Sequence, residues 1–244
     1  MDVHISGKGT VNSGEYETIS VSGSGILEGL VRCKSLHCSG SVKGNAEVEC
    51  AEGVHVSGSA HFDRALRAGN VKVSGSLRVA GAVNVDDVTK VSGSMHCGSI
   101  KSNLIKVSGK LTTEGDAEAE EIKISGGIQC KGLLNAERVE IKLGGTQSFA
   151  ESIGGSRILI YPEQLGKESF SRLPLLGKMI GVRSNGMTVQ ESIEGDEIAL
   201  EQVTAKSVVG RVVAIGKGCC IGTVQYSETV EIDEDAKVEH CEKI

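Results

Sequence analysis

The sequence predicts an all-β fold, a single-stranded parallel β-helix whose triangular coils each take about 17 residues. The main observation is a Ser-Gly dipeptide that recurs about every 17 residues through the first half of the chain. A repeat this short cannot bury an apolar face alone, so successive repeats must stack on one another. The dipeptides are Ser6-Gly7, Ser22-Gly23, Ser39-Gly40, Ser57-Gly58, Ser74-Gly75, Ser92-Gly93, Ser108-Gly109 and Ser125-Gly126.

The stretch from Asn70 to Val85 shows why each repeat is expected to form three strands. Apolar and polar residues alternate in three short runs, and a turn pair follows each run. A period of two is typical of strands with one buried face, and the density of glycine excludes helices. The runs are 71–73, 77–79 and 83–85, and the turn pairs are Ser74-Gly75, Ala80-Gly81 and Asp86-Asp87.

Two columns of mostly apolar residues predict which side chains face the interior. One column stands directly before each Ser-Gly pair, and the other stands five residues after each Ser. Each aliphatic side chain buried there contributes about 1.5–3 kcal/mol. The first column is Ile5, Val21, Cys38, Val56, Val73, Val91, Val107, Ile124, Ile141 and Ile158, and the second is Leu27, Gly44, Phe62, Val79, Cys97, Thr113 and Cys130.

The composition agrees with thin, stacked coils. Aromatic residues make up 2% of the 244 residues, there is no Trp, and there are 33 glycines. The interior must therefore be built from small and branched side chains. We expect the glycines to mark corners where the backbone adopts positive φ. The eight cysteines are expected to stay reduced and to pack mainly as small hydrophobes, with at most one of the adjacent Cys219 and Cys220 pointing inward.

The period breaks after Ile160, which predicts three parts: a β-helix over 1–160, an inserted loop or helical segment over 161–187, and a β-helix continuation with an acidic end over 188–244. The insertion places apolar residues beside basic ones, so it is expected to dock on a membrane or a partner protein. The alternative is that it folds back over the coils. The docking residues are Leu173, Leu175, Leu176, Met179 and Ile180.

Outward columns of basic residues predict charged stripes along the coils. Such a stripe fits anionic lipid or an acidic partner; the alternative is a solvated face whose lysines discourage lateral pairing. The pair His37 and His55 is a candidate for Zn²⁺ or Cu²⁺, but no third ligand follows from the spacing, so no metal or cofactor is expected. One stripe is His37, His55, Lys72, Lys90, Lys106 and Lys123, and the other is Lys43, His61, Arg78 and His96.

The net charge and the targeting signals limit which partners and which cellular location we expect. A net charge of −6 speaks against general nucleic-acid binding, and no glycine-rich loop opens a helix to hold a nucleotide. There is no apolar leader and no apolar run of membrane-spanning length. We expect a cytoplasmic protein, either free or peripheral at the inner face of the cell membrane.

The VSGS-type coils resemble those of the bactofilins, the polymer-forming cytoskeletal proteins of bacteria. The matching stretches are 56–59, 73–76 and 91–94. The resemblance implies a right-handed β-helix, nucleotide-independent polymerisation, and scaffold roles in cell shape, polarity or motility. Two features depart from the family: the coils begin almost at Met1 without a flexible tail, and an insertion interrupts them.

The leading interpretation is a structural scaffold, not an enzyme, that assembles end to end through its terminal coils. Val3 and Ile5 lie in the first coil, and Val230 and Ile232 lie in the last, so these residues are expected to make the contacts between copies. The acidic run 233–235 is an alternative cap for that end. A non-polymerising binding module is the second interpretation. A hexapeptide-type acyltransferase is the third, since Val-Gly and Ile-Gly pairs recur every six residues at 209, 215 and 221.

Overall fold

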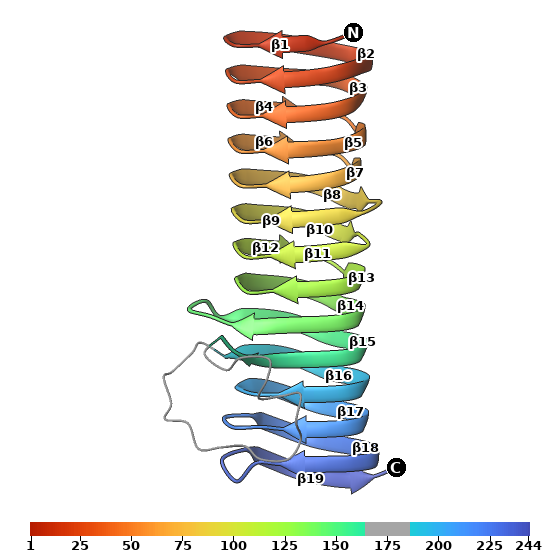
Figure 1. Ribbon diagram of the computed structural model, residues 1–244, viewed down its shortest axis with the longest axis vertical. Helices are drawn as coiled ribbons and strands as arrows, with labels where there is room; N and C mark the ends of the chain where they lie inside the picture. Colours follow the sequence, from red (N-terminus) through yellow and green to blue (C-terminus); the bar gives the residue numbers. More distant parts are fainter. Residues whose placement is uncertain (164–185) are drawn as a thin grey trace. The chain divides into compact units, whose positions relative to one another are not determined.

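The computed structural model describes residues 1–163 and 186–244, and every regular element in these two ranges is a β-strand. The chain divides into two compact units, Met1–Ala119 and Glu120–Ile244. Within each unit the strands pair in parallel with the strands one coil away, so each unit is a β-solenoid, and the predicted fold class is confirmed (Figure 1).

The first unit has two long strands near its beginning, β2 and β3, and most of its other strands are short. In chain order the strands are β1 (Val3–Ile5), β2 (Lys8–Val21), β3 (Ser24–Cys38), β4 (Ser41–Gly44), β5 (Val48–Val56), β6 (Ser59–Phe62), β7 (Leu66–Val73), β8 (Ser76–Val85), β9 (Val88–Val91), β10 (Ser94–Lys101), β11 (Leu104–Val107), β12 (Lys110–Thr113) and the beginning of β13 (Ala117–Ile124).

Each coil of the first unit has three paired segments, which make three faces. Val48 pairs with Leu66, Gly53 with Asn70, and Ser59 with Ser76, so each partner lies one coil further along the chain. A register shift in β5 between Cys50 and Gly53 separates the first two faces. The predicted three strands per coil are therefore present in this unit.

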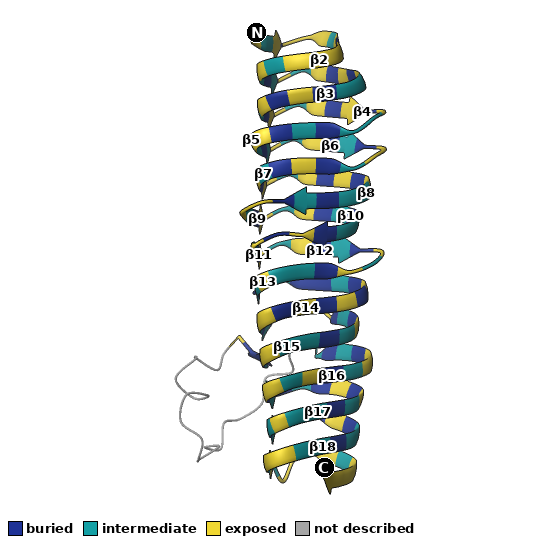
Figure 2. Ribbon diagram, turned by 90° about the vertical axis from the view of Figure 1, so that its right-hand side faces the viewer, coloured by how far each residue is buried: buried dark blue, intermediate teal, exposed yellow. Residues whose placement is uncertain are grey.

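Both interior columns predicted from the repeat are buried. Val73, which precedes a Ser-Gly pair, is fully buried, and so is Val79, five residues after the Ser. From Ser76 to Ala80, in the first half of β8, the residues alternate between exposed and buried, and Figure 2 shows the burial of each coil. Phe62 is one of the largest fully buried side chains and fits beside Gly44 in the preceding coil, where a Cβ would lie 2.9 Å from its ring.

The Ser-Gly corners require glycine for a different reason from the one expected. The three glycines with positive φ among the described residues are Gly14, Gly29 and Gly218, and none belongs to a Ser-Gly pair with the predicted spacing. At Gly75 a Cβ atom would instead lie 2.0 Å from the carbonyl oxygen of Gly58 in the preceding coil. The expectation of positive φ at these corners was wrong, and the close approach of stacked backbones is the physical cause.

The second unit continues the architecture with longer strands. They are the remainder of β13, then β14 (Gly127–Leu143), β15 (Ser148–Pro162), β16 (Met187–Leu200), β17 (Val203–Ile215), β18 (Cys220–Ile232) and β19 (Lys237–Lys243). Most strands here pair at the spacing of a single coil, as Val139 does with Ile158. Ile158 in β15, however, pairs with Ile198 in β16, more than two coil lengths further along the sequence. β15 and β16 are therefore neighbouring coils, although more than two coil lengths of sequence separate their paired residues.

The ends of β15 and β16 differ from the predicted bounds of the insertion, 161–187. Tyr161 and Pro162 are the last residues of β15, Met187 is the first of β16, and all three are buried. Tyr161 donates a hydrogen bond from its hydroxyl to Glu140 Oε1 at 2.6 Å. The strands β15 and β16 thus extend into both ends of the range that the break in the period predicted as an insertion.

Candidate functional site

The last coil of the second unit exposes apolar side chains that are buried in the coils before it. Ile232 stacks on Ile215 in register, yet Ile232 is 42% exposed and Ile215 only 1%. Val230 and Val213 differ in the same sense, since Val230 is half-buried and Val213 is buried. The cause is that β19 pairs with residues 220–226 and leaves 230–232 uncovered.

The acidic run after Ile232 forms a turn. The carboxylate of Asp233 accepts a hydrogen bond from Asp235 N at 2.8 Å, and Asp235 Oδ2 forms an ion pair with Lys217 Nζ at 2.7 Å. Asp233 also donates its N–H to the carbonyl of Ile215 at 2.8 Å. These contacts hold the turn against the preceding coil, which contains Ile215 and Lys217, and Ile232 remains exposed beside the turn.

The first coil of the first unit presents a smaller apolar step. Val3 pairs with Ile19 and Ile5 with Val21. Val3 is half-buried and Ile5 is 9% exposed, whereas Ile19 and Val21 are fully covered. β1 lies at the end of its unit and pairs with β2 (Figure 1).

A basic ladder, defined here as His37, His55, Lys72, Lys90 and Lys106, runs along one face of the first unit. These residues are paired one coil to the next in unbroken register. Parallel strands lie about 4.8 Å apart, so the three lysines stand close together. All three are exposed, and none makes an ion pair in the part of the chain that the structure describes.

Neighbouring charged columns are compensated, which sets the basic ladder apart. Arg32 Nε lies 2.8 Å from Glu49 Oε2 in the adjacent coil, and Lys101 Nζ lies 3.0 Å from Glu118 Oε2. Lys34 pairs with Glu17 in the same manner. Like charges stacked directly opposite one another are destabilising, so an uncompensated ladder of lysines costs stability that these columns avoid.

The second basic stripe is present but mixed with acids. Lys43, His61, Arg78 and His96 stack in register as the spacing predicts. Two acidic residues accompany this stripe: Asp63 Oδ1 lies 3.0 Å from His61 Nε2, and Glu114 Oε1 lies 3.2 Å from His96 Nε2. Its net charge is correspondingly smaller.

The histidine pair lies where the columns place it. The ring centroids of His37 and His55 are 6.1 Å apart in an edge-on arrangement. Burial, followed by the charge of Lys72 and the neighbouring His37, lowers the pKa of His55. A metal ion needs further ligands, and the described residues contain no group of three or more His, Cys, Asp or Glu side chains suitably placed.

The cysteines behave mainly as core residues. Cys38, Cys97, Cys130 and Cys219 are buried and Cys220 is exposed, as expected for the adjacent pair. The signal that sequence reasoning missed is the stacking of Cys33 on Cys50, which are one period apart. The glycine pairs of the hexapeptide-like stretch lie in or beside β17 and β18, and His240, the nearest histidine, is exposed in β19.

The predicted docking residues of the insertion, Leu173, Leu175, Leu176, Met179 and Ile180, lie outside the described residues, so their role stays a prediction. Lys123, the last member of the predicted stripe, belongs to the second unit and lies 2.8 Å from Glu121 Oε2. No helix long and apolar enough to cross a bilayer occurs in the described ranges.

Comparison with known proteins finds two relatives in Bacillus subtilis (strain 168). The chain is 33% identical to the uncharacterized protein YhbF over 107 residues, which cover 43% of this chain and 40% of YhbF. It is 34% identical to the uncharacterized protein YhbE over 107 residues, 44% of this chain and 41% of YhbE. The chain thus matches less than half the length of either relative. No family model matches, and no solved structure matches.

Proposed function

We propose that this protein is a structural scaffold that polymerises through the edges of its terminal coils, without nucleotide, into filaments. The observation that carries the proposal is the uncovered apolar step at Val230 and Ile232. In every earlier coil of this unit the same step is covered by the next coil. A second copy supplies the missing coil.

Strand pairing supports this mode of assembly. A parallel strand edge presents unpaired N–H and C=O groups that act as a template for another chain. Because each coil is nearly the same size as its neighbour, a coil from another copy fits this edge with the geometry used inside the unit. The half-buried Val3 in β1 offers a comparable edge in the first unit.

The proposed cellular role rests on the resemblance to bactofilins. The VSGS-type coils are typical of polymer-forming bacterial scaffold proteins, and relatives occur in Bacillus subtilis. We therefore propose a cytoplasmic scaffold that serves cell shape, polarity or motility, with itself as the main partner. In this role it needs neither a cofactor nor catalytic residues.

Negative-stain microscopy with light scattering tests the proposal. Purified protein without ATP or GTP is expected to form filaments whose amount rises with concentration. A protein that stays monodisperse and monomeric across buffers and concentrations contradicts it.

Variants locate the contacts. Val230→Asp with Ile232→Asp is expected to keep strand-rich circular dichroism and to abolish filaments, because charge then faces the incoming coil. Val3→Asp with Ile5→Asp tests the other edge. Ser227→Asp with Thr229→Asp is the matched control, since both positions are exposed on the same strand β18. Filaments from folded Val230/Ile232 variants would place assembly elsewhere on the surface.

The basic ladder favours a second function, attachment of the scaffold to an anionic membrane surface. Lys72, Lys90 and Lys106 form a row of exposed, uncompensated charge on one face. Each basic residue near an anionic bilayer contributes about 1 kcal/mol, and this contribution falls with ionic strength. The cost of stacking the lysines is offset when lipid phosphates lie against them.

Vesicle co-sedimentation tests this attachment. The protein is expected to sediment with phosphatidylglycerol vesicles at low salt, but not with phosphatidylcholine vesicles. Changing Lys72, Lys90 and Lys106 to Gln should abolish sedimentation. Changing Lys34, Arg67 and Lys101 to Gln removes the same charge from ion-paired positions and should retain it. If both triple variants lost co-sedimentation equally, the binding would depend on net charge alone, which would contradict a site specific to the basic ladder.

A further inference from the structure

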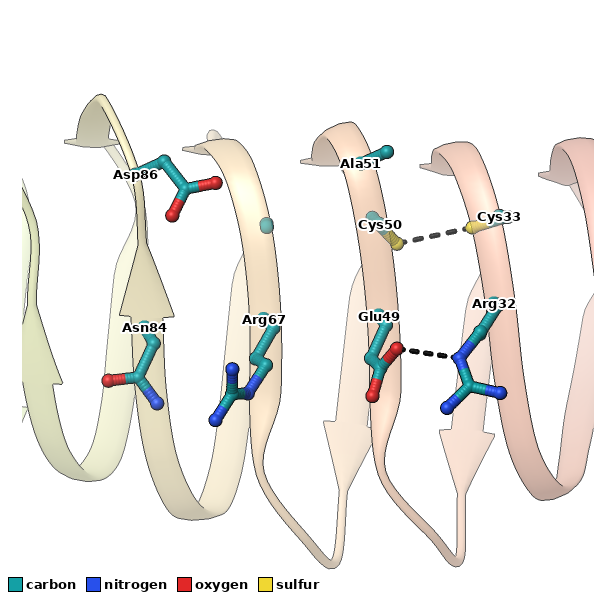
Figure 3. Close-up of a pocket in the computed structure, with 9 residues that line it drawn as sticks. Arg32, Cys33, Glu49, Cys50, Ala51, Arg67, Asn84 and Asp86 are labelled. Atoms are coloured by element: carbon teal, nitrogen blue, oxygen red, sulfur yellow. Dashed lines mark hydrogen bonds and ion pairs between the residues drawn. The ribbon is translucent and has the colours of Figure 1, made fainter.

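Cys33 and Cys50 form a close thiol pair between two stacked coils. Their Sγ atoms are 3.2 Å apart, and the two residues pair in register between β3 and β5 (Figure 3). In-register parallel strands hold Cα atoms about 4.8 Å apart, within the 4.4–6.8 Å range that disulfides span. A small rotation of both side chains closes the gap to the S–S bond length of about 2.05 Å.

A groove gives reagents access to this pair. It has a volume of about 330 Å³ and is lined by Arg32, Glu49, Arg67 and the two cysteines, among others (Figure 3). Cys33 is 6% exposed and Cys50 is 2% exposed. Cys38, Cys97, Cys130 and Cys219 do not line this groove. The thiol pair therefore combines proximity with an opening to solvent.

The two thiols are not equivalent. The hydrogen bond between them lowers the pKa of Cys33, although burial opposes this. The same hydrogen bond, together with burial, raises the pKa of Cys50. Cys33 is also the more exposed of the two thiols, so it is the one that ionises first, and the thiolate is the nucleophilic form.

We propose that Cys33 and Cys50 are a redox-active dithiol that low-molecular-weight disulfides oxidise to an intramolecular disulfide. The thiolate of Cys33 attacks one sulfur of the small disulfide, and the other sulfur leaves as a thiolate that takes up a proton. The Cys50 thiol then gives its proton to water and attacks Cys33 Sγ, which expels the second small thiol. Two protein thiols are oxidised, and one small disulfide is reduced to two thiols.

The disulfide ties one coil into a closed ring. Residues 33 and 50 are one full turn apart, so the bond links the second and third coils from the β1 end. A cross-link across such a loop stabilises the folded state mainly by restricting the unfolded chain. The oxidation state therefore sets how firmly these coils hold together, whether or not the protein polymerises.

Peptide mass spectrometry tests the proposal in a full-length Cys220→Ser, Cys241→Ser background, which removes the exposed thiols. After treatment with 2-hydroxyethyl disulfide and quenching with N-ethylmaleimide, we expect a cross-linked peptide pair that contains Cys33 and Cys50 and lacks two hydrogens. Thermal melting should show a rise of roughly 5 °C or more that dithiothreitol reverses.

Two single variants assign the roles. Cys50→Ser should stop at a mixed disulfide of Cys33 with mercaptoethanol, whereas Cys33→Ser should take up little reagent at Cys50. Equal uptake in both variants overturns Cys33 as the nucleophile. The proposal itself is overturned when Cys33 and Cys50 stay reduced under conditions that fully oxidise Cys220 and Cys241 in the unsubstituted protein.

Discussion

Gly75 lies directly over Gly58, and a Cβ atom on Gly75 would stand 2.0 Å from the carbonyl oxygen of Gly58. The reason is the hydrogen bonding of the corner. Ser74 and Gly75 both donate their N–H groups to the carbonyl of Val56, at 2.8 and 3.1 Å. The next donor, Ser76 N, reaches the carbonyl of Gly58 at 2.8 Å. The backbones are held together at the corner, and a side chain there has no room.

Gly75→Ala should therefore destabilise the protein by about 3 kcal/mol, because the clash is with backbone that three hydrogen bonds fix in place. Gly7→Ala is the matched control. Gly7 occupies the same place in the first Ser-Gly pair, but a Cβ on it would meet no atom of the described residues within 4 Å. Thermal melting should show a drop of several degrees for the first variant and little change for the second. If both variants lost the same stability, the need for glycine would instead come from its conformational freedom.

The alternation along the first unit makes a second prediction. Val73 is fully buried and Lys72 is exposed. Val73→Asp buries a charge without a partner and should unfold the coils or destabilise them by more than about 4 kcal/mol. Lys72→Asp should change the melting temperature little. Circular dichroism melts of the two variants compare the neighbouring positions, and a similar loss in both would contradict the register.

Thr113 gives a third prediction, because its buried hydroxyl oxygen has no hydrogen-bond partner among the residues that the structure describes. Thr113→Val keeps the shape and removes the unsatisfied group, so it should raise the free energy of unfolding by about 1–2 kcal/mol. Thr89 is equally buried, but its hydroxyl donates to Ser102 Oγ at 3.2 Å. Thr89→Val should lower stability. Urea titration of both variants checks the contrast, and a loss in both would show that Thr113 is satisfied in solution.

The repeat made much of this predictable. A parallel coil places residues one period apart on top of one another, so the columns through Val73 and Lys72 follow from spacing alone. The same reasoning reaches Cys33 and Cys50, which are one period apart and pair in register. The sequence analysis did not pick out this pair, because Cys33 and Cys50 are far apart along the chain and only the coil brings residues a full period apart into contact.

Other features depend on local geometry that the period does not contain. Alternation after the buried Leu200 predicts that Glu201 points outward, yet Glu201 is 5% exposed. Gln202 follows with a positive φ of 55° and redirects the chain. Glu201 then lies against Gly216, where a Cβ would meet its Cγ at 2.6 Å. The 17-residue period indicates neither the positive φ of Gln202 nor the close contact between Glu201 and Gly216.

The buried carboxyl of Glu201 predicts that the stability of the protein depends on pH. Burial, followed by the nearby charge of Asp233, raises its pKa from the ordinary 4.5 to about 7, and Lys217 opposes the shift. Because the folded pKa is the higher one, the contribution of this group to stability is full below about pH 4.5 and is lost as pH rises through 7. A shift of this size corresponds to about 3 kcal/mol at pH 8.

Glu201→Gln mimics the protonated carboxyl at every pH. At pH 4.5 the variant and the unsubstituted protein should melt within a degree or two of each other. At pH 8 the variant should be more stable by about 1–3 kcal/mol, because it carries no buried charge beside Asp233. Glu231→Gln, at an exposed position of β18, is the control and should show no such pH dependence. A stability difference between Glu201→Gln and the unsubstituted protein that is the same at both pH values would mean that Glu201 ionises normally in the folded protein.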